Sequence, residues 1–331
     1  MTEFTLLICD DSSMARKQLL RALPSGWPAQ VFHAADGQVG LELLRQKSID
    51  LVLLDLTMPV LDGYGMLAAI RREGLSCQVV VVSGDIQDEA VRRVTELGAL
   101  AFLQKPVDPA ILMRTLVDVG LYDPAARSGL AQGAEEPQPS FRDSFQEVVN
   151  VAMGQAAALL AKVLGVYVRL PVPNVNLMEV GELQMALAQA GNEKRLVTVS
   201  QGYIAGGISG EALLIFHDSE IADVARLMHW QPDQSSPMEL LLDLSCVLIG
   251  ACLRGIAAQL NLPFSQGHPQ ILSHDGELAQ CAQLEGVRWQ RTLAVELCYG
   301  IEGYDIHFDL LLLFSEDSVP LIQRNIAYLM E

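Results

Sequence analysis

Basic residues are scarce in this sequence, and their scarcity excludes one large class of partners. The 331 residues include 22 Lys and Arg against 40 Asp and Glu, which gives a formal net charge of −18. The segments before and after residue 121 are both acidic, and neither gathers Lys or Arg into a stripe. A field of this sign repels the phosphates of DNA and RNA, so we expect no nucleic-acid partner.

Cysteine pairs are absent as well. The six cysteines are Cys9, Cys77, Cys246, Cys252, Cys281 and Cys298, and no two of them form a C-x-x-C pair. Neither a zinc site nor a disulfide framework is therefore expected. Because most of these residues lie within apolar runs, we interpret them as reduced residues of the core.

Long hydrophobic runs and targeting signals are also missing. The longest uncharged apolar stretch, Leu244 to Leu253, is too short to span a bilayer. The first residues, MTEFTLLICDD, carry no basic region before their short apolar run, so we expect no signal peptide. These observations predict a soluble, cytoplasmic protein without membrane insertion.

The first 120 residues alternate short apolar runs with amphipathic segments of helical period. The expected strands are Thr5–Cys9, Val31–Ala34, Leu51–Leu54, Val79–Val82 and Ala101–Leu103. The helices expected after them are Ser13–Ala22, Gln38–Arg45, Tyr64–Arg72, Asp88–Leu97 and Pro109–Val119. Runs such as LVLL and VVVV are apolar on both strand faces, as parallel strands covered by helices must be. Five such units predict an α/β domain, residues 1–122, with a doubly wound, five-stranded parallel sheet.

The pattern of apolar and polar residues changes after this domain. Residues 123–140, DPAARSGLAQGAEEPQPS, hold three Pro and two Gly, which predicts a flexible linker. Beyond it, one order of elements occurs twice, as a long helix, strands, a hairpin and a closing helix. The segment NVAMG at Asn150 aligns with CVLIG at Cys246, 96 residues later. We therefore expect an α+β domain over 141–331, duplicated with pseudo-two-fold symmetry as repeats 141–231 and 238–331.

Within that domain the sequence places the long elements explicitly. The expected helices are Phe141–Leu164, Ser219–His229, Met238–Leu260 and one that begins at Val319, and the expected hairpins are Leu196–Phe216 and Thr292–Phe314. The first hairpin turns at the Gly-rich segment AGGISG.

Polar side chains follow four of the N-terminal strands at the point where each ends. Asp10 and Asp11 follow the first strand, Asp55 the third, Ser83 the fourth and Lys105 the fifth. The carboxyl ends of parallel strands share one edge of a sheet, where ligands bind, so we expect one cleft. Clustered carboxylates bind a hard cation such as Mg²⁺, and Asp55, from the central strand, is the expected nucleophile toward a phosphoryl group. Lys105 would neutralise a phosphoryl oxygen and Ser83 would bond one.

These motifs resemble the CheY-like receiver domains of response regulators, over residues 4–120. The matching segments are Asp10-Asp11, DLTMP at 55–59, Asp62-Gly63, Ser83-Gly84 and Lys105-Pro106. The resemblance implies a flavodoxin-like fold, a histidine kinase as phosphodonor and a cis Lys105–Pro106 bond. It also implies Mg²⁺ at Asp10, Asp11, Asp55 and the Thr57 backbone carbonyl, with Phe102 as the aromatic switch residue.

The long helix after the linker carries a second candidate site. Asp143, Glu147 and Asn150 stand four and three residues apart and so share one helical face. The amide can orient a water in line with a phosphorus atom, and the carboxylate can pair with a lysine of an incoming partner. An ordinary solvated helix face also contains such residues. Pro173, and the repeat of the layout as Glu239, Asp243, Cys246 and Pro269, favour a function.

Residues 141–331 resemble the CheC, CheX and FliY phosphatases of chemotaxis, whose signature the first copy matches in full. The resemblance implies that Glu147 docks against a receiver lysine, that Asn150 places the attacking water, and that the substrate is a phosphorylated CheY-like receiver. The second copy departs from the signature, with Asp243 in place of Glu and Cys246 in place of Asn. Since a thiol bonds water poorly, we expect a degenerate second site with Cys246 buried.

Two functions follow from these patterns. The first is a response regulator, phosphorylated on Asp55, whose output domain is an aspartyl-phosphate phosphatase gated by its own receiver. The alternative is a non-catalytic binding or adaptor module of the flagellar-switch type, also controlled by phosphorylation. The complete Glu147 and Asn150 pair favours the enzyme, and the degenerate second copy favours the binder. The cognate kinase, the substrate and the oligomeric state, a homodimer included, are left open by the sequence.

Overall fold

The computed structural model describes residues 4–24, 27, 29–122, 132–133, 139–183, 185, 196–230, 236–273 and 290–330. Most of the linker predicted at 123–140 lies outside the described residues, as does Cys281. The chain divides into two compact units, Met1–Glu147 and Val148–Glu331. The boundary falls inside helix α6 (Phe141–Leu164), so the first two turns of this helix belong to the first unit.

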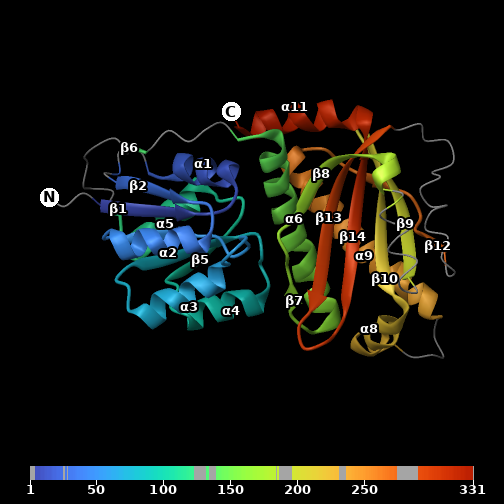
Figure 1. The fold of residues 1–331 in the computed structure, drawn as a ribbon, viewed down its shortest axis with the longest axis horizontal. Helices are drawn as coiled ribbons and strands as arrows, with labels where there is room; N and C mark the ends of the chain where they lie inside the picture. Colours follow the sequence, from blue (N-terminus) through green and yellow to red (C-terminus); the bar gives the residue numbers. More distant parts are fainter. Residues whose placement is uncertain are drawn as a thin grey trace. The chain divides into compact units, whose positions relative to one another are not determined.

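The first unit is built on a parallel sheet with strand order β5-β4-β3-β1-β2-β6 and helices on both faces (Figure 1). Its strands are β1 Phe4–Cys9, β2 Ala29–Ala34, β3 Leu51–Leu54, β4 Gln78–Ser83, β5 Ala101–Gln104 and β6 Gln132–Gly133. Its helices are α1 Ser13–Ala22, α2 Gly37–Gln46, α3 Gly63–Glu73, α4 Asp88–Glu96 and α5 Pro109–Asp118. The five expected β-α units are confirmed, whereas β6, which pairs in parallel with β2, was not expected within the linker.

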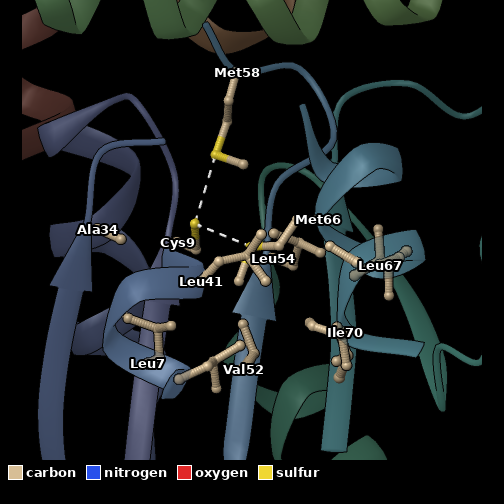
Figure 2. Close-up of a cluster of buried hydrophobic side chains, with 14 of the residues drawn as sticks. Leu7, Cys9, Ala34, Leu41, Val52, Leu54, Met58, Met66, Leu67 and Ile70 are labelled. Atoms are coloured by element: carbon tan, nitrogen blue, oxygen red, sulfur yellow. Dashed lines mark hydrogen bonds between the residues drawn. The ribbon is translucent and has the colours of Figure 1, made fainter. Parts of the chain in front are cut away.

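Two apolar cores cover the two faces of this sheet. Alternate residues of a strand point to opposite faces, so Leu7 and Cys9 belong to one core and Leu6 and Ile8 to the other. The first core lies against α2 and α3, and the second against α1 and α5. Figure 2 shows the first core, where Cys9 Sγ lies 3.8 Å from the Met58 sulfur and contacts a second methionine. Covering on both faces explains why these strands are continuous apolar runs.

The second unit is an α+β region with one eight-stranded sheet, in the order β11-β9-β10-β14-β13-β7, with β12 beside β9 and β8 beside β13. Its strands are β7 Val168–Arg169, β8 Asn174–Glu179, β9 Leu196–Ala205, β10 Ile208–His217, β11 Ser265–Gln266, β12 Gln270–Ser273, β13 Arg291–Ile301 and β14 His307–Ser315. The predicted hairpins are β9–β10 and β13–β14, and they meet through antiparallel pairing of β10 with β14. Gly206 and Gly207, both with positive φ, form the turn predicted at AGGISG.

The remaining helices of this unit begin and end close to the predicted positions. They are α8 Ile221–Leu227, α9 Pro237–Leu260 and α11 Val319–Met330, with short 3₁₀ turns η1 Asp218–Glu220 and η2 Glu316–Ser318. Helix α9 packs against β9 and β10, and α11 packs against α9 and β10 (Figure 1).

Helices α6 and α9 approach each other closely within the second unit. A Cβ placed on Gly255 of α9 would stand 2.7 Å from the Cα of Ala152 on α6. Gln259 Nε2 donates to the Val148 carbonyl at 2.7 Å, which fixes the crossing further. By length and hydropathy both helices could cross a membrane, but 72% and 67% of their apolar windows are buried in the structure. Burial to this extent is typical of helices in a protein core.

Candidate functional site

Three carboxylates converge at the carboxyl edge of the parallel sheet. The ligand oxygens of Asp10, Asp11 and Asp55 all lie within 4.8 Å of one another. They meet because β1 and β3 are neighbours in the sheet, and the Asp55 N–H donates to the Cys9 carbonyl at 2.9 Å. Asp10 and Asp55 are fully buried, and Asp11 is half-buried. The sequence had placed these residues in one cleft, and the structure brings them together.

Lys105 is the cation at the centre of this cluster. Its Nζ lies 2.7 Å from Asp10 Oδ2, 3.4 Å from Asp55 Oδ1 and 3.1 Å from Glu147 Oε1. The backbone N–H of Lys105 donates to the Ser83 carbonyl at 2.9 Å, which ties the end of β5 to the end of β4. The Lys105–Pro106 peptide is cis, as the resemblance to receiver domains implied. Glu147, from the second turn of α6, is thus part of the same buried cluster.

The cluster holds more negative than positive charge, and its pKa values reflect this. Burial, opposed by Lys105 and reinforced by Asp10, raises the pKa of Asp55 well above its ordinary value. Burial and then Asp10 raise the pKa of Asp11 to about 7. Burial also raises the pKa of Glu147, against the opposing effect of Lys105. Burial alone would lower the pKa of Lys105, but the surrounding carboxylates raise it well above its usual range. An additional cation would relieve this excess of negative charge.

The donor set fits a hard divalent cation. Three carboxylates at close range offer the oxygen ligands that Mg²⁺ prefers. Both carboxylate oxygens of Asp55 are buried and make no hydrogen bond to the described residues. Buried polar atoms of this kind are usually satisfied by a ligand, an ion or water. Thr57, whose backbone carbonyl was predicted as a further ligand, lies in the loop directly after β3.

Ser83 and Phe102 occupy the two strands on the far side of Asp55. Ser83, at the end of β4, is fully buried, and its Oγ accepts a hydrogen bond from the Asp85 N–H at 3.1 Å. Phe102, on β5, is half-buried and packs against the core that contains Cys9. The two residues thus stand on paired strands, with Phe102 opposite Val81 and Ser83 opposite Gln104.

The first turns of α6 make a contact that the sequence analysis missed. Asp143 accepts hydrogen bonds from the Ser13 N–H at 3.4 Å and from the Ser13 hydroxyl. Ser13 is the first residue of α1, two positions after Asp11, and its position at a helix start was the available signal. Asn150 lies one turn beyond Glu147 on α6, in the second unit.

The residues of the second copy lie on the outer side of α9. Asp243 and Cys246 are both exposed, so the expectation of a buried Cys246 was wrong. The buried positions Leu241, Leu244 and Leu248 recur at helical spacing and define the inner face of α9. Cys246 falls outside that face although it stands in an apolar run. Cys298 is exposed as well, whereas Cys9 and Cys252 are buried, as expected.

Comparison with known proteins identifies relatives of the N-terminal part. Residues 6–117 match the response regulator receiver domain family. A protein-glutamate methylesterase/protein-glutamine glutaminase of Myxococcus xanthus is 34% identical over 167 residues, which cover 48% of this chain and 46% of that protein. The probable transcriptional regulatory protein NarL of Mycobacterium tuberculosis is 30% identical over 166 residues, or 47% of this chain and 77% of that protein.

This chain spans less than half the length of the methylesterase relatives that it matches. Among solved structures, FliY of Thermotoga maritima aligns with 59% of this chain and 99% of its own, at 17% identity and a TM-score of 0.44.

Proposed function

We propose that Asp55 accepts a phosphoryl group, and that the face of α6 with Glu147 and Asn150 (the α6 face) removes such groups from phosphorylated receivers. The first part follows because this chain belongs to the response regulators through its N-terminal, phosphorylatable receiver domain. A histidine kinase is the proposed donor and a phosphorylated receiver the proposed substrate. The described cysteines are free thiols, which supports action in the reducing cytoplasm.

The receiver chemistry follows from the cluster around Asp55. One Asp55 oxygen attacks the phosphorus, the bond from phosphorus to the donor breaks, and Lys105 neutralises charge on the transferred group. Asp10, Asp11, Asp55 and the Thr57 carbonyl would hold Mg²⁺, which when bound supplies further charge compensation for the phosphoryl oxygens. Ser83, buried beside the cluster, is the proposed hydrogen-bond donor to the phosphoryl group.

One observation carries the phosphatase proposal: the Glu147 carboxylate lies 3.1 Å from the ammonium of Lys105. This is the carboxylate-to-lysine pairing through which a phosphatase helix would enter a receiver site. Asn150, one turn along the same helix, would then hold a water for in-line attack on phosphorus. The bond from phosphorus to Asp55 breaks, Asp55 leaves as a carboxylate, and inorganic phosphate is released. Such a reaction needs positioning more than it needs a nucleophile of the protein.

The proposal is tested with the full chain labelled by a small phosphodonor and Mg²⁺, followed by removal of the donor and timing of phosphate loss. We expect Asp55→Asn to abolish labelling. We expect Asn150→Ala to label normally and to retain its phosphate much longer than wild type. Equal rates of loss in wild type and Asn150→Ala would refute the phosphatase, and full labelling of Asp55→Asn would refute the acceptor.

A docking module without catalysis is the second candidate. It is favoured by α9, whose exposed Asp243 and Cys246 keep the layout of the first copy without its amide. In that case Glu147→Lys would abolish binding to a phosphorylated receiver, measured by pull-down with labelled chain, while Asn150→Ala would change neither binding nor phosphate loss.

We also infer that the second unit arose by duplication. In the β10–β14 pair, Gly210 is opposite Phe314 and Phe216 is opposite Phe308. A shift of 98 residues places β10 (Ile208–His217) onto β14 (His307–Ser315), so the two central strands of the sheet are the equivalent strands of the two copies. The edge strands support the same symmetry, since β8 pairs with β13 and β12 pairs with β9.

A further inference from the structure

The Asp143 carboxylate links the first turn of α6 to the first turn of α1. Its Oδ1 accepts from the Ser13 N–H at 3.4 Å, and its Oδ2 accepts from the Ser13 hydroxyl. Both oxygens of one carboxylate are therefore engaged by a single residue of the receiver. Neither residue belongs to the acidic cluster or to the Glu147–Asn150 pair.

The receiver side of this contact is suited to an anion. Helix α1 has no acidic residue in its first turn, so its partial positive charge is not compensated from within the helix. Ser12 caps the helix by accepting from the Ala15 N–H at 3.2 Å, but the Ser13 N–H needs another acceptor. Asp143 provides both the acceptor and the negative charge.

The equivalent position on α9 shows what Asp143 does differently. There Ser236 accepts from the Glu239 N–H and Glu239 Oε2 accepts from the Ser236 N–H at 3.0 Å, which closes a capping box. On α6, Ser140 likewise accepts from the Asp143 N–H, at 3.1 Å. The box prefers Glu or Gln, and Asp is one methylene shorter. The Asp143 carboxylate is engaged by Ser13 instead.

We propose that Asp143 is a specificity-determining residue, which selects receivers that present a hydroxyl and a free N–H at the start of α1. This inference rests on the proposed phosphatase function and adds a second anchor to it. Glu147 holds the receiver lysine, and Asp143 holds the start of α1, so two residues in the first turns of α6 bind the receiver at separate points. The partner chemistry is a helix N-terminus with a serine at its first position, on this receiver or on another.

The test times phosphate loss from the full chain, labelled on Asp55 and freed of donor. Ser13→Asp places a carboxylate against Asp143, while an acidic residue at this position favours helix α1 itself. Asp143→Glu keeps the charge and allows the capping box that α9 forms, so the helix is retained and the carboxylate withdraws from Ser13. We expect loss to slow about tenfold in Ser13→Asp and about threefold in Asp143→Glu, as charged hydrogen bonds of this kind warrant.

A charge swap separates recognition from a structural effect. Ser13→Asp combined with Asp143→Lys should restore the rate to within about twofold of wild type, because the pair again attracts. Glu239→Gln, at the matched position on α9, should leave the rate unchanged. Single variants with wild-type rates, or a double variant slower than either single one, would overturn the inference.

A last control locates the effect and separates it from the proposed function. In the Asn150→Ala variant, adding Ser13→Asp should leave the remaining slow rate of phosphate loss unchanged. If that rate changed, Ser13→Asp would be acting on the receiver alone and the inference would be overturned. If Asn150→Ala slows loss and the Ser13 and Asp143 variants do not, the specificity role fails while the phosphatase stands. If Asn150→Ala has no effect, the phosphatase itself fails.

Discussion

Gly63 lies directly against the backbone carbonyl of Asp55, so closely that a Cβ on Gly63 would stand 2.2 Å from that oxygen. The Gly63 N–H donates to the Leu56 carbonyl at 3.0 Å, and Asp62 caps α3 by accepting from the Gly65 N–H at 2.7 Å. The loop that carries Asp55 is thus closed onto the start of α3, with no room for a side chain at its narrowest point.

Gly63→Ala is therefore expected to displace the backbone of Asp55. We expect it to lower the free energy of unfolding by at least about 2 kcal/mol, the usual cost of overpacking against backbone, and to slow labelling by a small phosphodonor. Gly181→Ala is the control, because a Cβ there meets no atom within 4 Å. Urea unfolding provides the measurement, and equal midpoints for the two variants would contradict the prediction.

Mg²⁺ is expected to stabilise the receiver, because it relieves the repulsion among Asp10, Asp11 and Asp55. At a concentration tenfold above its dissociation constant, the ion should add about 1.4 kcal/mol to the free energy of unfolding. Differential scanning calorimetry with Mg²⁺ and with a chelator measures the gain. Asp11→Asn should abolish most of it, whereas Asp118→Asn, an exposed change on α5, should preserve it. A gain of equal size in all three proteins would exclude this cluster as the metal site.

Glu147 and Asn150, the pair proposed to be catalytic, and their counterparts on α9 form a matched set. Glu147→Ala and Asn150→Ala should each slow phosphate loss at least tenfold, about 1.4 kcal/mol of transition-state stabilisation. Asp243→Ala and Cys246→Ala, at the equivalent exposed positions, should have little effect. A Cys246 variant as slow as the Asn150 variant would show that both copies are active and overturn the degenerate second site.

The crossing of α6 and α9 sets the stability of the second unit. Gly255→Leu should weaken it by about 2 kcal/mol or more, because even a Cβ would stand 2.7 Å from the Ala152 backbone. Gly250→Ala on the same helix is the control, since the nearest atom there is the guanidinium of Arg254, at 3.2 Å, which can move. That change should be neutral or gain up to about 1 kcal/mol from helix propensity, as thermal unfolding followed by circular dichroism would detect.

The receiver could be predicted closely because its determinants are local and repeated. Continuous apolar strands imply helices on both faces, and polar residues at strand ends, such as Asp10 and Asp55, must meet at one edge. The contact of Ser13 with Asp143 joins residues 130 positions apart, and no periodicity in either helix encodes it. Cys246 was predicted to be buried because its neighbours in the sequence are apolar, although its position in the helical repeat places it on the exposed side of α9. The pairing of β6 with β2 depends on backbone hydrogen bonds, and a Pro- and Gly-rich sequence gives no pattern that indicates them.

The Lys105–Glu147 ion pair and a phosphoryl group on Asp55 would compete for one ammonium. Lys105 lies 3.4 Å from Asp55 Oδ1 and 3.1 Å from Glu147 Oε1. A phosphorylated residue adds between about one and two negative charges and strong acceptor oxygens, which would share the ammonium of Lys105 and weaken its pairing with Glu147 of the same chain without abolishing such pairing. Release of Glu147 would free the α6 face for a receiver of another molecule. Phosphorylation of Asp55 should therefore activate the α6 face toward other receivers, a sign of gating that the sequence left open.

We therefore expect this protein to act faster on a separate receiver once Asp55 is phosphorylated. The substrate is the full Asn150→Ala chain carrying radiolabelled phosphate on Asp55, which keeps its own phosphate. Wild-type chain, treated or untreated with unlabelled phosphodonor, is added, and release of labelled phosphate is timed. Treatment should raise the rate several-fold for wild type and leave the Asp55→Asn enzyme unchanged. The opposite result has two parts. Treated and untreated wild type would release labelled phosphate from the separate receiver at equal rates. Wild type would also lose its own phosphate at a rate that depends on Asn150 but not on protein concentration. Hydrolysis within one molecule would then replace gating, and the chain would be a switch that resets itself.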